Sequence, residues 1–199
     1  PATYERILNN IRDARVTIHS TITAQIAERP GYLEEFLQFW SGRPQISKIW
    51  FSLFTPQRGA TDAEILTPKQ RSAVVADLRK LRLRYPILEM PEALLNEIES
   101  PPGSPSECIF ARTTKTISAD LKTAITPCQF GGNPDCRQCG CFASMGLAAV
   151  GHHKVVGRLT AGRLFLASDR IGKQWRKLTE RFKPHPAPRP AEASPFNIV

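Results

Sequence analysis

The stretch SKIWFSLFTP, residues 47–56, is apolar on both of the faces that a β-strand presents. Such a strand is typical of a parallel sheet that is covered on both sides by helices. The earlier stretch RVTIHSTIT, residues 15–23, alternates strictly, with Val16, Ile18 and Ile22 set against polar neighbours. This alternation predicts a second strand with one apolar face and one polar face.

Helical patterns surround and separate these two strands. Apolar residues at helical spacing predict helices over residues 3–14 and 31–40. Thr67-Pro68-Lys69-Gln70 has the sequence of a capping box, so a third helix is expected to begin there. This order of elements predicts βα units that feed a parallel sheet with right-handed crossovers. Because two strands do not make a free-standing parallel sheet, we expect further strands upstream of Pro1.

The chain after residue 86 predicts shorter elements. They are, in order, a helix over 91–100, a rigid linker over 101–105, a hairpin formed by 115–118 and 122–126, a loop over 131–134, a helix that starts at Cys141, a helix over 159–182, and a disordered Pro-rich tail over 184–199. The hairpin is expected to bring its two flanking cysteines together.

All five cysteines lie in this second part of the chain, at Cys108, Cys128, Cys136, Cys139 and Cys141. Clustered thiolates point to a soft metal centre, either zinc or an iron–sulfur cluster. A disulfide framework is disfavoured because the number of cysteines is odd and no signal peptide is recognisable. We therefore expect a reducing, cytoplasmic location.

The net charge of the chain is +9, which raises the question of a nucleic-acid partner. Much of the excess, however, lies after residue 169. A solvated helix face and a tail explain this distribution, so we do not expect nucleic acid as a partner.

The apolar runs, such as Ile49-Trp50-Phe51, are too short to span a membrane.

Three segments of the cysteine region together resemble a known family. They are Cys108-Ile109-Phe110, Ser118-Ala119-Asp120 and Thr126-Pro127-Cys128, and they follow the βα units. This arrangement resembles the C-terminal half of radical S-adenosylmethionine (SAM) enzymes that carry an auxiliary cluster domain of the SPASM or twitch kind. Cys136, Cys139 and Cys141 depart from the family pattern, because their spacing is C-x2-C-x-C and the usual spacing is wider.

The resemblance implies an α/β fold: the C-terminal fragment of a partial (β/α) barrel, then a small cysteine-rich cluster domain and a C-terminal helix. Residues 1–86 would be the last two βα units, 87–150 the cluster domain, 151–183 the helical segment and 184–199 the tail.

The resemblance also implies the cofactors and partners. Four of the five cysteines would hold one auxiliary [4Fe–4S] cluster, with Cys139 and Cys141 as the ambiguous pair. The C-x3-C-x2-C motif of the SAM-cleaving cluster is absent, since no cysteine precedes Cys108. SAM and a second [4Fe–4S] cluster would therefore be bound only with an upstream half or a separate chain. The substrate would be a peptide or a small molecule, and the electron donor a ferredoxin or flavodoxin.

His19 and Thr21 lie on the polar face of the first predicted strand. In a partial barrel this face is expected to point into the reaction cavity. The simpler alternative is that neighbouring threonines hydrogen-bond His19, which then has no functional role. His152 and His153 lie outside the cysteine window and are not expected to be ligands.

Two other functions use the same residues. One is a structural zinc module that binds nucleic acid, although the C-x19-C spacing is wide for a zinc ribbon. The other is a non-catalytic partner subunit that carries only the auxiliary cluster.

Overall fold

The computed structural model describes residues 2–157 and 159–180, and it is a mixed α/β structure with small sheets. Its elements, in chain order, are α1 (Ala2–Asn10), β1 (Val16–Ile22), α2 (Ala24–Ala27), α3 (Tyr32–Ser41), β2 (Ile46–Leu53), α4 (Pro68–Arg84), α5 (Glu92–Glu99), α6 (Ile109–Thr113), β3 (Thr116–Ile117), β4 (Ala124–Ile125), the 3₁₀-helix η1 (Cys136–Gln138), α7 (Phe142–His152), β5 (Lys154–Val156), β6 (Leu159–Thr160) and α8 (Ala161–Glu180). The predicted tail, 184–199, lies outside the described residues.

Strands β1 and β2 are parallel, as predicted, and pair from Val16–Ile46 to Ile22–Leu53. On its other edge, β2 forms a parallel bridge between Ile49 and Leu88. Residues 87–89 thus occupy the position of a third parallel strand, reduced to a single bridge. This segment was not predicted from the sequence, because its apolar pattern is too short to stand out.

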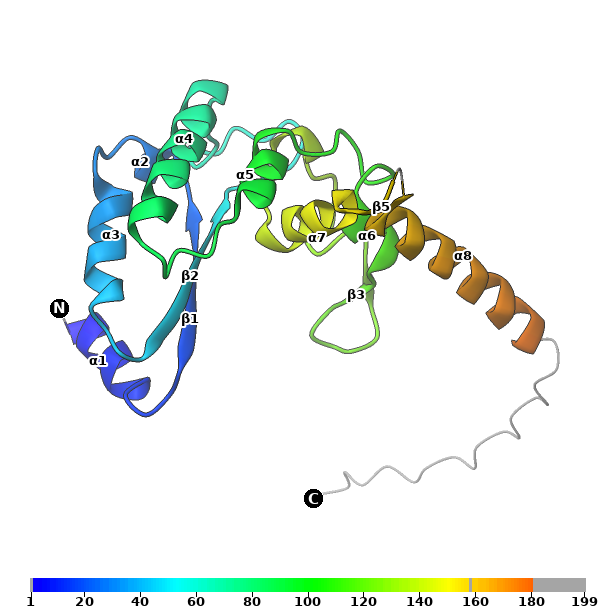
Figure 1. Ribbon diagram of the computed structural model, residues 1–199, viewed down its shortest axis with the longest axis horizontal. Helices are drawn as coiled ribbons and strands as arrows, with labels where there is room; N and C mark the ends of the chain where they lie inside the picture. The colour runs from blue at the N-terminus through cyan, green and yellow to red at the C-terminus, as the bar shows by residue number, and fades with distance from the viewer. Residues whose placement is uncertain (1, 158, 181–199) are drawn as a thin grey trace, which may run out of the picture.

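Helices lie on both sides of this sheet. Figure 1 shows α2, α3 and α4 on one side of β1 and β2, and α5 and α7 on the other. The predicted capping box is confirmed: the Thr67 side chain accepts from the Gln70 amide, and the Gln70 side chain accepts from the Thr67 amide. Buried side chains of the sheet and of α3, α4 and α5 form one core, which extends into α7 through Met145.

The second half of the chain agrees with the prediction in part, but α6, η1 and one hairpin were not predicted. The expected hairpin before Cys128 is present as β3 and β4, which pair antiparallel. A further hairpin, β5–β6, lies between α7 and α8, where only helix was predicted. Its strands have three and two residues, too few for an alternating pattern to be recognised. Helix α8 follows this hairpin and extends away from the body (Figure 1).

Among the described residues, no helix combines the length and the apolar character that crossing a bilayer requires.

Candidate metal centre

Four of the five cysteines line one small cavity between α6, the loop after β4, η1 and α7. They are Cys108, Cys128, Cys136 and Cys139, and the cavity has a volume of about 20 Å³. The other lining residues include Pro102, Pro105, Ala111, Phe130 and Pro134, so the wall is largely apolar and contains no carboxylate or imidazole. A cluster of thiols in an apolar, water-poor wall is the donor set that a soft metal centre needs.

The thiols are free and are not yet arranged around a common point. Within the described ranges, no three His, Cys, Asp or Glu side chains are placed so that they could hold a metal ion. The cavity has room for about one water-sized group. Binding of a larger group would therefore require the thiols to rotate about their χ1 angles.

Local structure brings each of the four cysteines to the cavity. Cys108 precedes the first turn of α6, and Cys128 follows the β3–β4 hairpin. The Asp120 carboxylate organises the hairpin turn by accepting from the Ser118 hydroxyl and from the Thr123 amide and hydroxyl. These hydrogen bonds, with that of Ser118 the largest, hold the pKa of Asp120 well below its usual range. Asp120 thus has a structural role in placing Cys128.

Gly140 attaches the Cys139–Cys141 segment to the carboxyl end of β2. The Leu53 amide donates to the Gly140 carbonyl at 2.9 Å, and the Gly140 amide donates to Thr55 Oγ1 at 2.9 Å. A Cβ atom on Gly140 would lie 2.3 Å from Leu53 Cβ and 2.4 Å from the Leu53 carbonyl oxygen. Only glycine permits this close approach of the two backbones. This explains why a glycine lies between Cys139 and Cys141.

A second attachment joins the loop before Cys136 to the segment that follows β2. The Arg58 amide donates to the Asn133 carbonyl, and the Asp135 amide donates to the Pro56 carbonyl, both at 2.8 Å. Gln57 Oε1 accepts from the Asn133 amide at 2.7 Å. The cysteine region is therefore tied to the carboxyl end of a parallel strand at two places.

Cys141 differs from the other four cysteines. Its sulfur caps α7 by accepting from the Ser144 amide at 3.4 Å, and it also accepts from Gln129 Nε2 at 2.7 Å. It is buried, with 4% of its surface exposed, and does not line the cavity. Of the pair that the sequence left ambiguous, the structure places Cys139 at the cavity and Cys141 in a capping position.

Burial favours the protonated form of three of the cavity thiols, those of Cys128, Cys136 and Cys139. It raises the pKa of Cys139 to about 12, and it also raises the pKa values of Cys128 and Cys136. Cys108 is an electrostatic neighbour of all three of these thiols. A metal binds thiolates, so metal binding at this site would release protons. Metal binding would therefore become more favourable as the pH rises.

A cation from α4 lies against this site. The guanidinium of Arg71, on α4, donates to the carbonyls of Ile98, Gln138 and Cys139. Burial lowers the pKa of Arg71, and the electrostatic interaction with Cys139, which acts when this thiol is ionised, opposes the change. No carboxylate pairs with Arg71 in the described part of the chain. A half-buried cation is stabilised by a nearby anion, and ligated thiolates would supply one here.

We expect Arg71→Met to destabilise the metal-free protein by about 3 kcal/mol, because three carbonyls lose their donor. Arg71→Lys should destabilise the protein less, since an ammonium group still donates to some of these carbonyls. Chemical denaturation under reducing conditions measures both effects. Lys69→Met, an exposed change on the same helix, is the matched control and should be neutral. A neutral result for Arg71→Met would show that this residue does not hold the cysteine loop.

His19 is exposed on the polar face of β1, but its partner is not a threonine. Its Nε2 lies 2.7 Å from Ser52 Oγ, on the neighbouring strand, and this oxygen also accepts from the Phe142 amide at 3.0 Å. The expectation that threonines satisfy His19 is therefore wrong, because strand pairing sets His19 beside β2. Through Ser52, the polar face of the sheet is connected to the residue that follows Cys141. Thr21 lies exposed on the same strand.

Phe142, the first residue of α7, also contacts strand β2. Its ring stacks on Trp50, with 4.5 Å between centroids and an interplanar angle of 10°. Trp50 Nε1 in turn donates to Glu89 at 2.9 Å. The sequence did not predict this aromatic pair, because Trp50 belongs to a predicted strand and Phe142 belongs to a separate predicted helix.

His152 does not belong to the thiol group, and it pairs through Nδ1 with Glu97 on α5.

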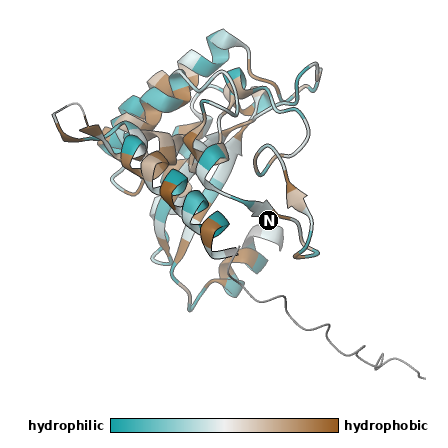
Figure 2. Ribbon diagram, turned by 90° about the vertical axis from the view of Figure 1, so that its right-hand side faces the viewer, coloured by the Kyte–Doolittle hydropathy of each residue, from teal (hydrophilic) through white to brown (hydrophobic). Residues whose placement is uncertain are grey.

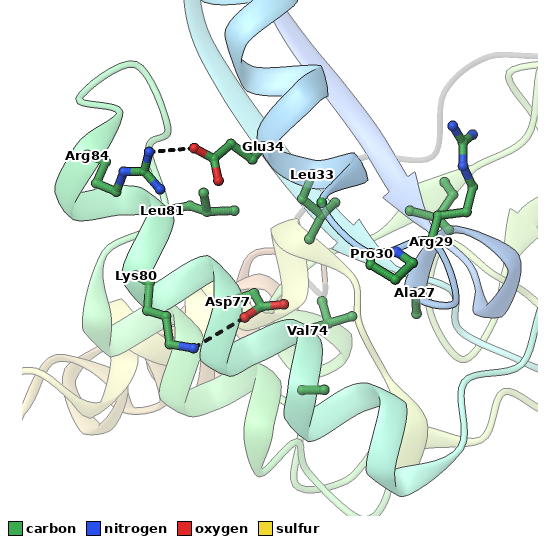
Figure 3. Close-up of a pocket in the computed structure, with 13 residues that line it drawn as sticks. Ala27, Arg29, Pro30, Leu33, Glu34, Val74, Asp77, Lys80, Leu81 and Arg84 are labelled. Atoms are coloured by element: carbon green, nitrogen blue, oxygen red, sulfur yellow. Dashed lines mark ion pairs between the residues drawn. The ribbon is translucent and has the colours of Figure 1, made fainter.

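The structure has a larger cavity, of about 290 Å³, between α3 and α4 (Figure 3). Four of its charged side chains form ion pairs with one another: Arg84 contacts Glu34, and Lys80 contacts Asp77 at 3.5 Å. The cavity contains no cysteine. We therefore regard the thiol-lined cavity as the candidate site.

No protein-family model, curated protein or solved structure matches this chain.

Proposed function

We propose that the chain is the C-terminal part of a radical SAM enzyme and holds one auxiliary [4Fe–4S] cluster near the substrate. The observation that carries the proposal is a thiol-lined cavity attached to the carboxyl end of the parallel strand β2. In parallel β/α proteins, ligand and active sites are built at the carboxyl ends of the strands. The same thiols in a purely structural zinc module would have no need of this location.

Cys108, Cys128, Cys136 and Cys139 would be the ligands, and Cys141 would remain the cap of α7. When bound, such a cluster supplies a relay for electrons or a binding point for the substrate. The protein's own contribution is to exclude water with the apolar wall, to hold the loop through Gly140, and to offset negative charge with Arg71.

In this proposal β1, β2 and residues 87–89 are strands of a partial barrel, and His19 and Thr21 face the substrate. The cysteines that bind the SAM-cleaving cluster would lie upstream or on another polypeptide, and a ferredoxin or flavodoxin would be the electron donor. An in-frame C-x3-C-x2-C in the coding sequence upstream of Pro1 supports the proposal. A complete open reading frame without it, and no partner chain that carries it, would contradict the enzyme assignment.

Anaerobic reconstitution with iron and sulfide tests the cluster itself. We expect four irons and four sulfides per chain and an absorption band at about 400 nm. A colourless protein that contains one zinc and no sulfide would contradict the proposal and favour the zinc module.

A further inference from the structure

Among the described residues, helix α8 is held to the body only near its beginning. Gly162 packs on Gly151, and a Cβ atom at Gly162 would lie 2.9 Å from the Gly151 carbonyl oxygen and 3.1 Å from Ile109 Cδ1. Leu166, one turn further on, is half-buried. Beyond this point the helix leaves the body (Figure 1), and most of its residues are exposed.

The solvent side of α8 carries a row of large apolar side chains, Leu164, Ile171, Trp175 and Leu178, which we call the outer stripe. Their spacing of three, four and seven residues places them on one helix face. Ile171 is 66% exposed, Trp175 68% and Leu178 52%. Hydrophobic residues mark α8 as brown bands along its length in Figure 2. An apolar row of this size is unfavourable in water unless a partner covers it.

Cations border the outer stripe. Arg163, Arg170 and Lys177 each come directly before a stripe residue, at a spacing of seven, so they form a row along one edge of the stripe. Residues 161–180 contain five Lys and Arg, with Arg176 and Lys173 on the rest of the surface, against Asp169 and Glu180, which gives a net charge of 5 − 2 = +3.

These charges indicate which kind of partner covers the outer stripe. A second copy of α8 would bring like charges together, and Ala167 and Gln174 interrupt the apolar seam that a coiled coil requires. A bilayer with anionic head groups complements both features of the helix. The apolar side chains enter the boundary between head groups and acyl chains, and the long Arg and Lys side chains reach the phosphates. Tryptophan is also favoured at this boundary.

We propose that α8 is a docking surface for an anionic lipid bilayer and lies parallel to it, with the outer stripe inserted. This inference does not depend on the cluster, because no residue of the thiol cavity takes part. It describes binding to a membrane surface, and it agrees with the finding that no helix in the described residues could span a membrane.

Vesicle co-sedimentation of the full 199-residue chain tests the proposal. We expect binding to phosphatidylcholine vesicles that contain about one-third phosphatidylglycerol, and little binding to pure phosphatidylcholine. Arg170→Glu with Lys177→Glu should weaken binding by about 25-fold or more, at about fivefold for each cation lost. Ile171→Glu should abolish binding, and its exposed position leaves the fold intact.

The matched control is Lys69→Glu with Lys115→Glu, which changes the net charge equally at exposed positions outside α8. If both charge pairs weaken binding to the same extent, the contact is general electrostatic attraction and the proposal is wrong. Failure of the wild-type chain to bind anionic vesicles would also overturn it. So would a dimer in light scattering that Ile171→Glu dissociates, because the stripe would then be covered by a second copy.

Discussion

Serine in place of Cys108, Cys128, Cys136 or Cys139 is expected to abolish stable assembly of the cluster. Each of these thiols lines the same cavity, and serine is a poor ligand for iron at neutral pH because its hydroxyl stays protonated. Iron and sulfide analysis after anaerobic reconstitution measures the effect, together with the absorption at about 400 nm. For each variant we expect less than about one-tenth of the wild-type content.

Cys141→Ser is the internal control for this series. Serine is a good N-cap residue, so it replaces the capping hydrogen bond that the Cys141 sulfur accepts from Ser144. This variant should assemble the cluster to the wild-type level. If it loses the cluster while one of the other four variants retains it, our assignment of the ligands is wrong.

The second large effect is expected from Gly140→Ala. The new methyl group would overlap the Leu53 side chain and carbonyl, and neither backbone can move without breaking the Leu53–Gly140 hydrogen bond. We expect the free energy of unfolding of the metal-free protein to fall by about 3 kcal/mol or more. The cluster content after reconstitution should fall as well, since Gly140 lies between Cys139 and Cys141.

Gly146→Ala is the matched change in this case. Gly146 lies in α7, and a Cβ atom there would meet nothing within 4 Å. Alanine should therefore be neutral or stabilise the helix by up to about 1 kcal/mol. Urea denaturation of both variants separates the two effects. Equal stability of Gly140→Ala and the wild type would show that the segment does not pack on β2 as described.

The local structure could be predicted from the sequence where a short pattern determines it. The alternation in residues 15–23 predicts β1, and Thr67 with Gln70 predicts the start of α4. The hairpin around Asp120 follows from the polar turn between two short β-branched runs. In each case neighbouring residues decide the conformation, so no long-range information is needed.

The contacts that build the site could not be predicted in this way. Arg71 donates to the Cys139 carbonyl across 68 residues, and Ser52 accepts from the Phe142 amide across 90. Such contacts depend on how α4, β2 and α7 pack, and no local pattern specifies that packing. The C-x2-C-x-C spacing indicates a metal site, yet the different positions of Cys139, which lines the cavity, and Cys141, which caps α7, follow from the packing of this segment.

Native mass spectrometry of the anaerobically reconstituted wild-type chain tests the central claim most directly, because it weighs the bound group on each molecule. We predict a single holo species whose added mass is that of one four-iron, four-sulfide cluster, with the same mass retained in Cys141→Ser. The added mass of one zinc ion, or no added mass at all, would contradict the account.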